Sequence, residues 1–326
     1  MLKAQYQHRG PVPQDVIEAI EFQLPAPAAG QALIKVLASP INPSDVLTLT
    51  GEYGILPPLP AIGGNEGVGR IEALGEGVSH LQVGQTVLLP VGSGTWTSHM
   101  LAEAAKLIAL PAANPQQLSM LTINPPTAYL MLKEFVDLQP GDWVIQNAAN
   151  SGVGSYLIQL AKIRGLKTVN VVRREAAVAD VQAQGGDVVL VDGPDLHKRV
   201  KAATDGAAIK LGIDAVAGTG TEHLANCLSE GGVLVNYGRM SGEPCQITPS
   251  AFVFRDITLR GFWLAKWFQK ATPAQQMAVF GELIQLIASG QLHTKVAATY
   301  DVSQIKQAVA AAAGGERGGK ILIVPA

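Results

Sequence analysis

Cysteine is nearly absent from this chain. Only Cys227 and Cys245 occur in 326 residues, which is too few for a disulfide framework, and their spacing fits no zinc motif. We expect two buried or inert thiols in a reducing compartment. Because 48 % of the residues are hydrophobic and only 15 % are charged, the chain can bury a large core, and its length allows two domains.

An excess of charge and a long apolar run are lacking as well, and residues 1–6 do not show the pattern of a leader sequence. Lys and Arg number 24 against 26 Asp and Glu, so the net charge of −2 favours neither nucleic acid nor an anionic membrane surface. No apolar run is long enough to span a bilayer. Residues 1–6, MLKAQY, have neither the apolar core of a signal peptide nor the Arg-rich pattern of a transit peptide. We therefore expect a cytoplasmic protein that binds neither nucleic acid nor membrane.

Helical periodicity is weak in the first hundred or so residues, which are rich in Gly and Pro. Short apolar runs between turn clusters predict strands in this part of the chain. The predicted strands are residues 32–38, 67–74, 86–90 and 106–110. This part is therefore expected to be an all-β module in the form of a distorted barrel.

Helices and strands alternate in the rest of the chain. Two helices come first, the second with Pro125-Pro126 at its N-terminus, where proline is tolerated. The alternation predicts a parallel sheet covered by helices on both faces. The expected helices are 118–122, 126–135, 155–164, 176–184, 196–203, 222–228, 273–289 and 302–313, and the expected strands are 143–146, 168–172, 188–191, 212–215, 233–237, 258–262, 297–300 and 320–324.

Residues 142–174 carry the clearest functional signal. They read as strand, Gly-rich turn, helix and strand, which is the opening βαβ unit of a dinucleotide-binding fold. Aligned on Gly-x-Gly-x-x-Gly, the turn has Ala149, Ser151 and Gly154. The small residues still allow a backbone close to a pyrophosphate, and the helix N-terminus offers N–H groups. Taken alone, such a turn is also compatible with an ordinary strand-to-helix loop.

Two arginines follow the second strand of this unit. An NAD-preferring unit usually has Asp or Glu about 20 residues beyond the turn, to bind the ribose 2′-hydroxyl. Here Arg173 and Arg174 would instead attract a 2′-phosphate, so the sequence predicts NADPH as the cofactor. The alternative is a solvated pair of charges at the end of a strand.

A β-barrel, an inserted dinucleotide-binding part and a returning C-terminus resemble the medium-chain dehydrogenase/reductase superfamily over essentially the whole chain. The resemblance implies an α/β protein with two domains. A GroES-like β-barrel catalytic domain would comprise residues 1–120 and 266–326. A Rossmann domain with a doubly wound parallel sheet would comprise residues 121–265 and bind NADPH.

Many members of that superfamily bind a catalytic zinc ion through Cys and a Gly-His-Glu segment. The corresponding stretches here are residues 41–45 and 63–67, which contain no cysteine, and Asn65 stands at the histidine position. The four-cysteine structural zinc lobe is missing too. Because zinc needs three or four well-spaced ligands, we expect no metal, and a turn or hydrogen-bonding role for Asn65 and Glu66.

Within the superfamily, the chain resembles the mitochondrial-type trans-2-enoyl thioester reductases. The Asn-Pro-Pro-Thr-Ala-Tyr segment, together with Asn-Ser-Gly-Val-Gly, is much more specific than a Gly-rich loop alone. The segments that carry the resemblance are residues 42–45, 51–54, 63–67, 124–129, 146–154 and 259–264.

The resemblance implies a role for each matching position. Tyr53 would be the catalytic residue, and Asn124 would contact the cofactor and help to orient the nicotinamide or the substrate. The remaining implied cofactor-binding residues are Asn150, Ser151, Gly152, Val153, Arg173, Arg174, Tyr237, Gly238, Arg239, Met240, Phe262, Trp263, Leu264 and Lys320.

Each of these roles has a plainer alternative in the residues themselves. Tyr53 could pack in a turn, and Asn124 could cap a helix before Pro125. Arg239 could face solvent. Phe262 and Trp263 could belong to the core or to a dimer interface.

The leading functional hypothesis is NADPH-dependent reduction of 2-enoyl thioesters carried by coenzyme A or acyl carrier protein. The first alternative is an NADPH:quinone or enone reductase, and the second is a non-catalytic NADPH-binding regulatory protein. We also expect a homodimer formed through the Rossmann domains. Apolar residues 251–254 and 262–264 would otherwise leave an exposed edge strand.

Overall fold

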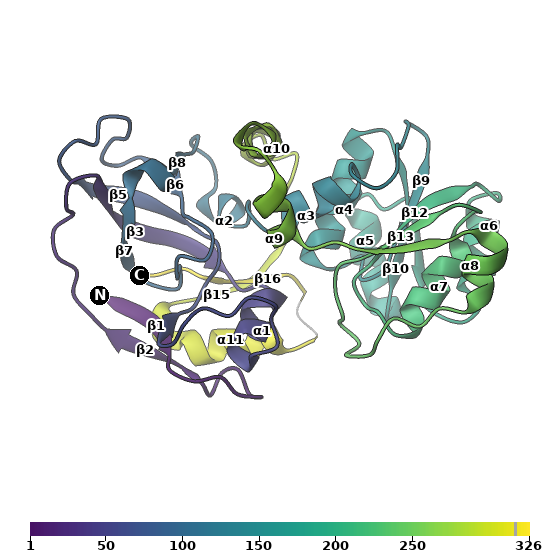
Figure 1. Ribbon diagram of the computed structural model, residues 1–326, viewed down its shortest axis with the longest axis horizontal. Coiled ribbons are helices and arrows are strands. Elements are labelled where there is room, and N and C mark those ends of the chain that lie inside the picture. Colours follow the sequence, from purple (N-terminus) through teal and green to yellow (C-terminus); the bar gives the residue numbers. More distant parts are fainter. Residues whose placement is uncertain (316–317) are drawn as a thin grey trace. The chain divides into compact units, whose positions relative to one another are not determined.

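The computed structural model describes residues 1–315 and 318–326, and the chain divides into two compact units (Figure 1). Unit 1 comprises Met1–Ile123 and Phe280–Ala326, and unit 2 comprises Asn124–Val279. The sequence predicted the boundaries of domains, which are parts of a chain that fold independently. Those domain boundaries stay a prediction.

Unit 1 is built on two sheets. The smaller one has the order β2-β1-β4, and the larger one has the order β15-β16-β3-β5-β6-β8, with β7 paired to β3 as well. Strand β16 pairs antiparallel with the end of β3, so the C-terminal segment completes a sheet that begins within the first forty residues. The strands are Leu2–Tyr6 (β1), Ile17–Glu21 (β2), Gln31–Pro40 (β3), Ala61–Ile62 (β4), Val68–Leu74 (β5), Thr86–Leu88 (β6), His99–Glu103 (β7), Ile108–Ala109 (β8), Val296–Tyr300 (β15) and Lys320–Ile323 (β16).

Strand β3 shows why the larger sheet forms. Its alternate residues Ala32, Ile34, Val36 and Ala38 are fully buried, because successive side chains of a strand point to opposite faces. Ala32, Ile34 and Val36 pack in one apolar cluster with side chains from β5, β6 and β7. The predicted strand at 32–38 is therefore confirmed, and it lies in the interior of the sheet.

Unit 1 also contains a helix, so the expectation of an all-β module was wrong. Helix α1 runs over Pro43–Thr50, with Asn42 at its N-cap and proline in its first turn. The carboxylate of Asp45 accepts the backbone N–H of Asn42 at 2.7 Å, and Gly51 ends the helix in the left-handed region at φ 88°. These signals stand in the sequence, but a helix this short has little apolar periodicity.

The other helices of unit 1 correct two further expectations. Helix α2 comprises Pro115–Leu118 and not 118–122, because the Asn114 side chain accepts the backbone N–H of Gln116 and starts the helix earlier. The expected strand at 106–110 is shortened to β8 by a 3-10 turn, Ala104–Lys106 (η1). The remaining elements are Val302–Gln304 (η3), Ile305–Ala313 (α11) and Pro273–Ala288 (α10), which contains the second unit boundary.

Unit 2 is a parallel sheet of six strands in the order β11-β10-β9-β12-β13-β14. This is the doubly wound order, which reverses between β9 and β12. The predicted α/β class with a Rossmann sheet is confirmed. The strands are Trp143–Gln146 (β9), Lys167–Val172 (β10), Val188–Val191 (β11), Ile209–Asp214 (β12), Val233–Asn236 (β13) and Thr258–Gly261 (β14).

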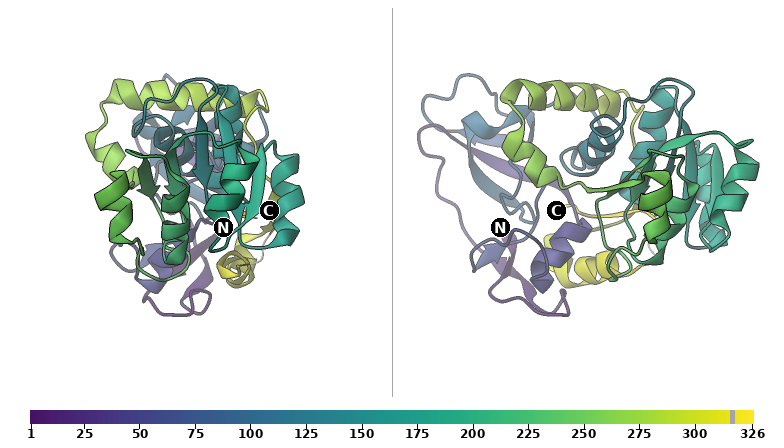
Figure 2. Two further views of the ribbon diagram at one scale, coloured as in Figure 1. Left: turned by 90° about the vertical axis from the view of Figure 1, so that its right-hand side faces the viewer. Right: turned by 45° about the vertical axis from the view of Figure 1, so that its right-hand side comes forward.

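Helices cover both faces of this sheet (Figure 2). Side chains of α4 and α5 pack on one face, and those of α6, α7 and α8 pack on the other. The helical elements are Asn124–Met131 (α3), Gly152–Ile163 (α4), Glu175–Ala177 (η2), Val178–Ala183 (α5), Leu196–Ala203 (α6), Thr219–Cys227 (α7), Pro249–Arg255 (α8) and Leu264–Lys270 (α9).

Two apolar stretches near the edge strand β14 were misassigned. Residues 251–254 lie in helix α8, which begins with Pro249 and ends at Asp256 in the left-handed region. Residues 262–264 follow β14 and lead into helix α9. Neither stretch extends the sheet, so β14 is the edge strand on this side and β11 is the edge strand on the other.

Candidate functional site

The carboxyl ends of β9, β12 and β13 meet at a buried carboxylate. Asp214 ends β12, and its oxygens accept hydrogen bonds from the amide of Asn147 at 2.7 Å, from the hydroxyl of Thr221 at 2.8 Å and from the amide of Asn236 at 3.0 Å. The backbone N–H groups of Val216 and Ala217 also donate to Asp214, at 2.9 and 3.0 Å. This group fixes the loops at the point where the strand order reverses, which is where such sheets bind ligands.

The Gly-rich turn lies beside this group and opens helix α4. Ser151 is the N-cap of α4, and its hydroxyl accepts the backbone N–H of Gly154 at 3.1 Å. A Cβ at Gly154 would lie 2.5 Å from the carbonyl oxygen of Ala149, so only glycine allows the helix to pack this closely. The turn therefore presents the start of a helix of 12 residues, which favours an anion.

The predicted residues of this turn differ in exposure. Asn150 is exposed, and Ser151 and Gly152 are half-buried. Val153 belongs to the core, so its side chain is directed inward. A ligand at this turn would therefore meet backbone groups and the Asn150 and Ser151 side chains.

Arg173 and Arg174 follow β10 directly, and both are exposed. Arg174 has extended backbone and precedes the 3-10 turn η2. The two guanidinium groups are thus near the carboxyl end of β10, the strand that pairs with β9.

A pocket of ≈ 420 Å³ lies at the carboxyl ends of β13 and β14. It brings together five of the predicted residues, Tyr237, Gly238, Arg239, Phe262 and Trp263. Gly238 approaches its neighbour closely, since a Cβ there would lie 2.7 Å from the carbonyl oxygen of Ala215. Burial raises the pKa of the Tyr237 hydroxyl, which hydrogen-bonds with the Ser151 side chain and so connects this pocket to the Gly-rich turn.

Of the predicted segments 237–240 and 262–264, two residues do not line this pocket, and three lining residues were missed. Met240 is 64 % exposed, and Leu264 is buried at the start of α9. Asn236, Gly261 and Lys266 also line the pocket. Asn236 and Gly261 end predicted strands, which is a usable signal, whereas nothing in the sequence distinguishes Lys266 from other lysines. Phe262 also packs edge-to-face on Phe135 at 6.1 Å, so part of its role is structural.

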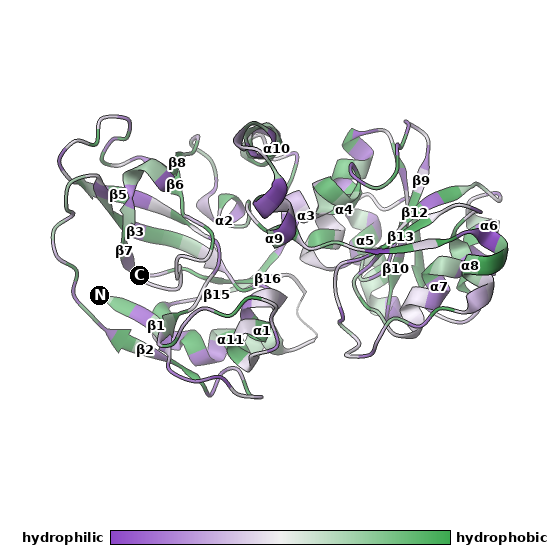
Figure 3. Cartoon of the chain, in the orientation of Figure 1, coloured by the Kyte–Doolittle hydropathy of each residue, from purple (hydrophilic) through white to green (hydrophobic). Residues whose placement is uncertain are grey.

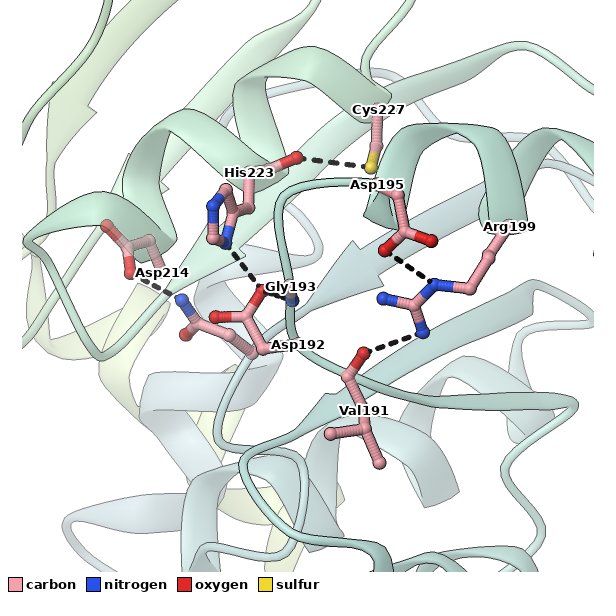
Figure 4. Close-up of polar contacts among 9 residues, drawn as sticks. Val191, Asp192, Gly193, Asp195, Arg199, Asp214, His223 and Cys227 are labelled. Carbon is pink, nitrogen blue, oxygen red and sulfur yellow. Dashed lines mark hydrogen bonds and ion pairs between the residues drawn. The ribbon is translucent and has the colours of Figure 1, made fainter.

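A second polar group lies after β11 (Figure 4). The Asp192 carboxylate accepts the backbone N–H of Gly193 and contacts His223 Nδ1, each at 2.8 Å. Arg199 donates to the carbonyl of Val191 at 2.8 Å. These bonds hold α6 and α7 against the end of β11.

Both cysteines are free thiols. The thiol of Cys227 donates to the carbonyl of His223, and burial together with the charge of Asp192 raises its pKa to about 12. Cys227 therefore stays a protonated thiol near neutral pH. Cys245 is half-buried, and neither cysteine forms a disulfide.

Tyr53 and Lys320 belong to unit 1, whereas the other predicted site residues belong to unit 2. Tyr53 is half-buried and follows α1 within one turn. The carbonyl of Leu47 accepts the backbone N–H groups of Gly51, Glu52 and Tyr53, at 2.9–3.2 Å. The C-terminal end of α1 therefore determines where the Tyr53 side chain begins.

A buried polar cluster lies at the other end of α1. The Glu66 carboxylate accepts the amide of Asn42 at 2.7 Å, and the Asn65 amide donates to Asp45 at 2.7 Å. The expected hydrogen-bonding role of Asn65 and Glu66 agrees with these contacts. Burial raises the pKa of Glu66, against the charge of Lys320 and the hydrogen bonds from Asn42 and Thr122.

Lys320 is a member of this cluster. The lysine is only 5 % exposed, and its ammonium donates to the side-chain oxygen of Asn42 at 2.5 Å. The cofactor contact that the resemblance implies for Lys320 stays a prediction. The chain places this lysine inside unit 1 because β16 pairs with β3 immediately before Asn42.

Asn124 is buried and is the first residue of helix α3. Its side chain therefore lies at the start of the helix that opens unit 2.

Among the residues that the structure describes, no group of three or more His, Cys, Asp and Glu could hold a metal ion, and no helix is long and apolar enough to cross a membrane.

Comparison with known proteins assigns both parts of the chain. Residues 28–112 match the alcohol dehydrogenase GroES-like domain, and residues 152–282 match the zinc-binding dehydrogenase family. The mitochondrial enoyl-[acyl-carrier-protein] reductase of Rattus norvegicus is 39 % identical over 287 residues, which cover 86 % of this chain and 77 % of the rat protein. The human enzyme of the same name is 39 % identical over 297 residues, covering 88 % and 79 %.

The chain belongs to the family of these enoyl-[acyl-carrier-protein] reductases, within the medium-chain dehydrogenase/reductase superfamily. Two solved structures are similar over nearly all of its length. The complex of Candida tropicalis Etr1p with NADP and crotonyl-CoA has a TM-score of 0.89 at 27 % identity and covers 99 % of both chains. A Bacillus thuringiensis protein named as an NADPH:quinone reductase has a TM-score of 0.89 at 28 % identity and covers 100 % of this chain and 99 % of its own.

Proposed function

We propose that this protein uses NADPH to reduce the 2,3 double bond of 2-enoyl thioesters by hydride transfer to Cβ. The observation that carries the proposal is the identity of 39 % to enzymes named enoyl-[acyl-carrier-protein] reductases, over more than three quarters of their length. The similarity to the Etr1p complex with NADP and crotonyl-CoA supports both the cofactor and the substrate class.

Tyr53 is proposed as the catalytic residue. When bound, NADPH supplies the hydride, and the electron pair of the double bond moves onto Cα and the thioester oxygen. The Tyr53 hydroxyl donates a hydrogen bond to that oxygen and stabilises the enolate. Cα then takes up a proton, passed on by Tyr53 or from water, which completes the saturated thioester.

The remaining site residues are proposed to bind the cofactor. The pyrophosphate would lie at the start of α4, against Asn150, Ser151, Gly152 and Val153. Arg173 and Arg174 would bind the 2′-phosphate, because guanidinium groups form charge-assisted bonds with phosphate. The nicotinamide half would be held by the segments 237–240 and 262–264, with Asn124 and Lys320 as further contacts.

Quinone or enone reduction is the second candidate, favoured by the similarity to the Bacillus thuringiensis protein. Both reactions use the same hydride donor, so the cofactor site does not separate them. A non-catalytic NADPH-binding role is disfavoured because Tyr53 is retained. The proposed enzyme uses no metal, and elemental analysis showing one zinc ion per chain would contradict this.

We propose a homodimer formed through unit 2. Strand β14 is one edge of its sheet. Part of the neighbouring helix α8 is coloured as hydrophobic in Figure 3. Its Val253 is 71 % exposed and its Phe254 is 78 % exposed. An exposed strand edge beside apolar side chains favours pairing with a second copy. Light scattering at micromolar concentration would show a dimer.

The expected cytoplasmic location stays a prediction, since the relatives named above are mitochondrial.

A panel of substrates tests the proposed function. NADPH oxidation would be followed with crotonyl-CoA, with a longer enoyl-CoA and with a 1,2-quinone under the same conditions. We expect the highest kcat/KM with an enoyl thioester. Turnover of the quinone without turnover of any enoyl thioester would replace the proposal by its alternative. Binding of NADPH without turnover of any substrate would favour the non-catalytic role.

A further inference from the structure

One buried carboxylate, that of Glu66, holds two separate segments of unit 1. Its Oε1 accepts the amide N–H of Asn42 at 2.7 Å. Its Oε2 accepts the backbone N–H of Thr122 at 2.9 Å, the hydroxyl of Thr122 at 2.9 Å and the backbone N–H of Ile123 at 3.0 Å. Glu66 itself is fully buried.

Both segments lead to residues with proposed functions. Asn42 is the N-cap of α1, and the other end of α1 holds the backbone of Tyr53 through the Leu47 carbonyl. Thr122 and Ile123 come directly before Asn124 in the chain. The two oxygens of Glu66 therefore connect the start of the Tyr53-bearing helix with the residues that precede Asn124.

The Asn42 amide cannot turn round without breaking this arrangement. Its nitrogen donates to Glu66, and its oxygen accepts from the Lys320 ammonium. An amide flip would place its oxygen against the carboxylate and its nitrogen against the ammonium. The negative charge of Glu66, with Lys320 beside it, therefore fixes the direction of the whole chain of hydrogen bonds.

We propose that Glu66 is a positioning residue for the reaction, which acts by holding α1 and hence Tyr53, and by holding the backbone that leads into Asn124. The proposal rests on the proposed function. Under this proposal, a buried carboxylate has a measurable effect on hydride transfer although it does not contact the reacting atoms. A residue that only stabilised the fold would change the melting temperature and leave the rate of that step unchanged.

Glu66→Gln separates the two halves of this role. The glutamine oxygen can still accept the donors of Thr122 and Ile123, but its NH₂ then faces the NH₂ of Asn42. The hydrogen bond to the N-cap of α1 is lost, while the hydrogen bonds from residues 122 and 123 are kept. We expect kcat with crotonyl-CoA to fall by about 10- to 100-fold, as for a catalytic group that is misplaced by about 1 Å, with the KM for NADPH nearly unchanged.

A second variant reaches the same bond from the other partner. Asn42→Ser keeps a good helix N-cap, so α1 can still form, but it cannot bridge Glu66 and Lys320. Its kcat should fall to a similar degree. Because both changes break one bond, the double variant should be little worse than either single variant. Asp187→Asn is the matched control, since Asp187 also accepts a backbone N–H and a hydroxyl, both from Thr168, and lies in none of the proposed binding segments.

The decisive measurement is the primary isotope effect on kcat with NADPH deuterated at the transferred position. Slower hydride transfer in Glu66→Gln and Asn42→Ser should raise the isotope effect above that of the wild type, and Asp187→Asn should not. If the wild type turns over enoyl thioester while both variants keep its kcat and isotope effect, the positioning role is wrong and the proposed function stands. If the wild type turns over neither enoyl thioester nor quinone, both are wrong.

Discussion

The side-chain amide of Asn147, just after β9, donates a 2.7 Å hydrogen bond to the carboxylate of Asp214 at the end of β12. The two strands are neighbours at the point where the strand order of the sheet reverses. The Asn147 oxygen in turn accepts the backbone N–H of Ala215 at 2.7 Å. A reciprocal pair of bonds thus fixes the two loops between which a dinucleotide is expected to bind.

Asp214→Asn should therefore weaken both the fold of unit 2 and NADPH binding. The new NH₂ group would face N–H or O–H donors that now have an acceptor, and leaving such a buried donor unsatisfied costs about 1–3 kcal/mol. We expect a lower melting temperature and at least a roughly tenfold higher Kd for NADPH, a factor that corresponds to about 1.4 kcal/mol. Calorimetric titration and thermal melts of this variant, beside Asp187→Asn, would measure both. Wild-type affinity in Asp214→Asn would show that these loops do not hold the cofactor.

Arg173→Ala should weaken NADPH far more than NADH. A charge-assisted bond to phosphate contributes about 1.5–3 kcal/mol, so one or two such bonds correspond to roughly ten- to several-hundred-fold or more in affinity. Wild-type protein should prefer NADPH by a factor in this range. The measurement is kcat/KM with each cofactor for the wild type, for Arg173→Ala and for Arg174→Ala. Equal values for NADPH and NADH in the wild type would contradict the assignment.

Tyr53→Phe should lower kcat on crotonyl-CoA and leave NADPH affinity nearly unchanged. Removing one donor to a developing oxyanion typically costs about 2.7–4 kcal/mol, or roughly 10²–10³ in rate. Because the ring is kept, folding should be unaffected, and thermal melts provide that control. If Tyr53→Phe keeps wild-type turnover, the Tyr53 side chain only lines the site and its hydroxyl takes no part in the reaction.

Asp45 should make the stability of unit 1 depend on pH. Burial, and secondarily the charge of Glu66, raise the pKa of Asp45 from 3.8 to about 7, against hydrogen bonds from Asn42 and Asn65 and the charge of Lys320. The folded protein then binds this proton more tightly than the unfolded chain. The stability that this supplies is complete below about pH 4 and is lost as the pH rises to about 7.

Asp45→Asn tests this dependence, because it removes the titrating group. Each unit of pKa difference corresponds to about 1.4 kcal/mol, so the wild type should lose a few kcal/mol relative to the variant between about pH 4 and pH 7. Melting temperatures of both proteins at about pH 5 and pH 8 would show the gap shifting in favour of the variant at the higher pH. A gap that is the same at both values would mean that Asp45 does not titrate in this range.

Local signals in the sequence were sufficient to predict the Rossmann half of the fold. The strand, turn and helix around Gly154 and the arginines after β10 are contiguous, so their spacing alone predicts the unit. Helix α1 was missed although Asn42-Pro43 and Gly51 mark its ends, because eight residues show too little periodicity. Helix α8 was missed because its apolar residues were interpreted as a strand.

The parts that could not be predicted depend on contacts between distant residues. The burial of Lys320 could not be predicted, because its partner Asn42 lies 278 positions earlier in the chain. Asp214 accepts hydrogen bonds from the loop after β9, from α7 and from β13, and no local pattern distinguishes it from a surface aspartate. A hydrogen-bonding role of Glu66 and Asn65 was expected, but their partners in α1 and in the segment before Asn124 could not be predicted, because those segments are distant in the sequence.

The most direct test of the proposed reaction is where the hydride goes. Crotonyl-CoA would be reduced with NADPH deuterated at the transferred position of its nicotinamide ring, and the butyryl-CoA product would be analysed by NMR. Hydride transfer to Cβ predicts one deuterium at C3 of the acyl chain and a solvent-derived proton at C2. Deuterium at C2, or a reduced product without deuterium, would contradict hydride transfer to Cβ.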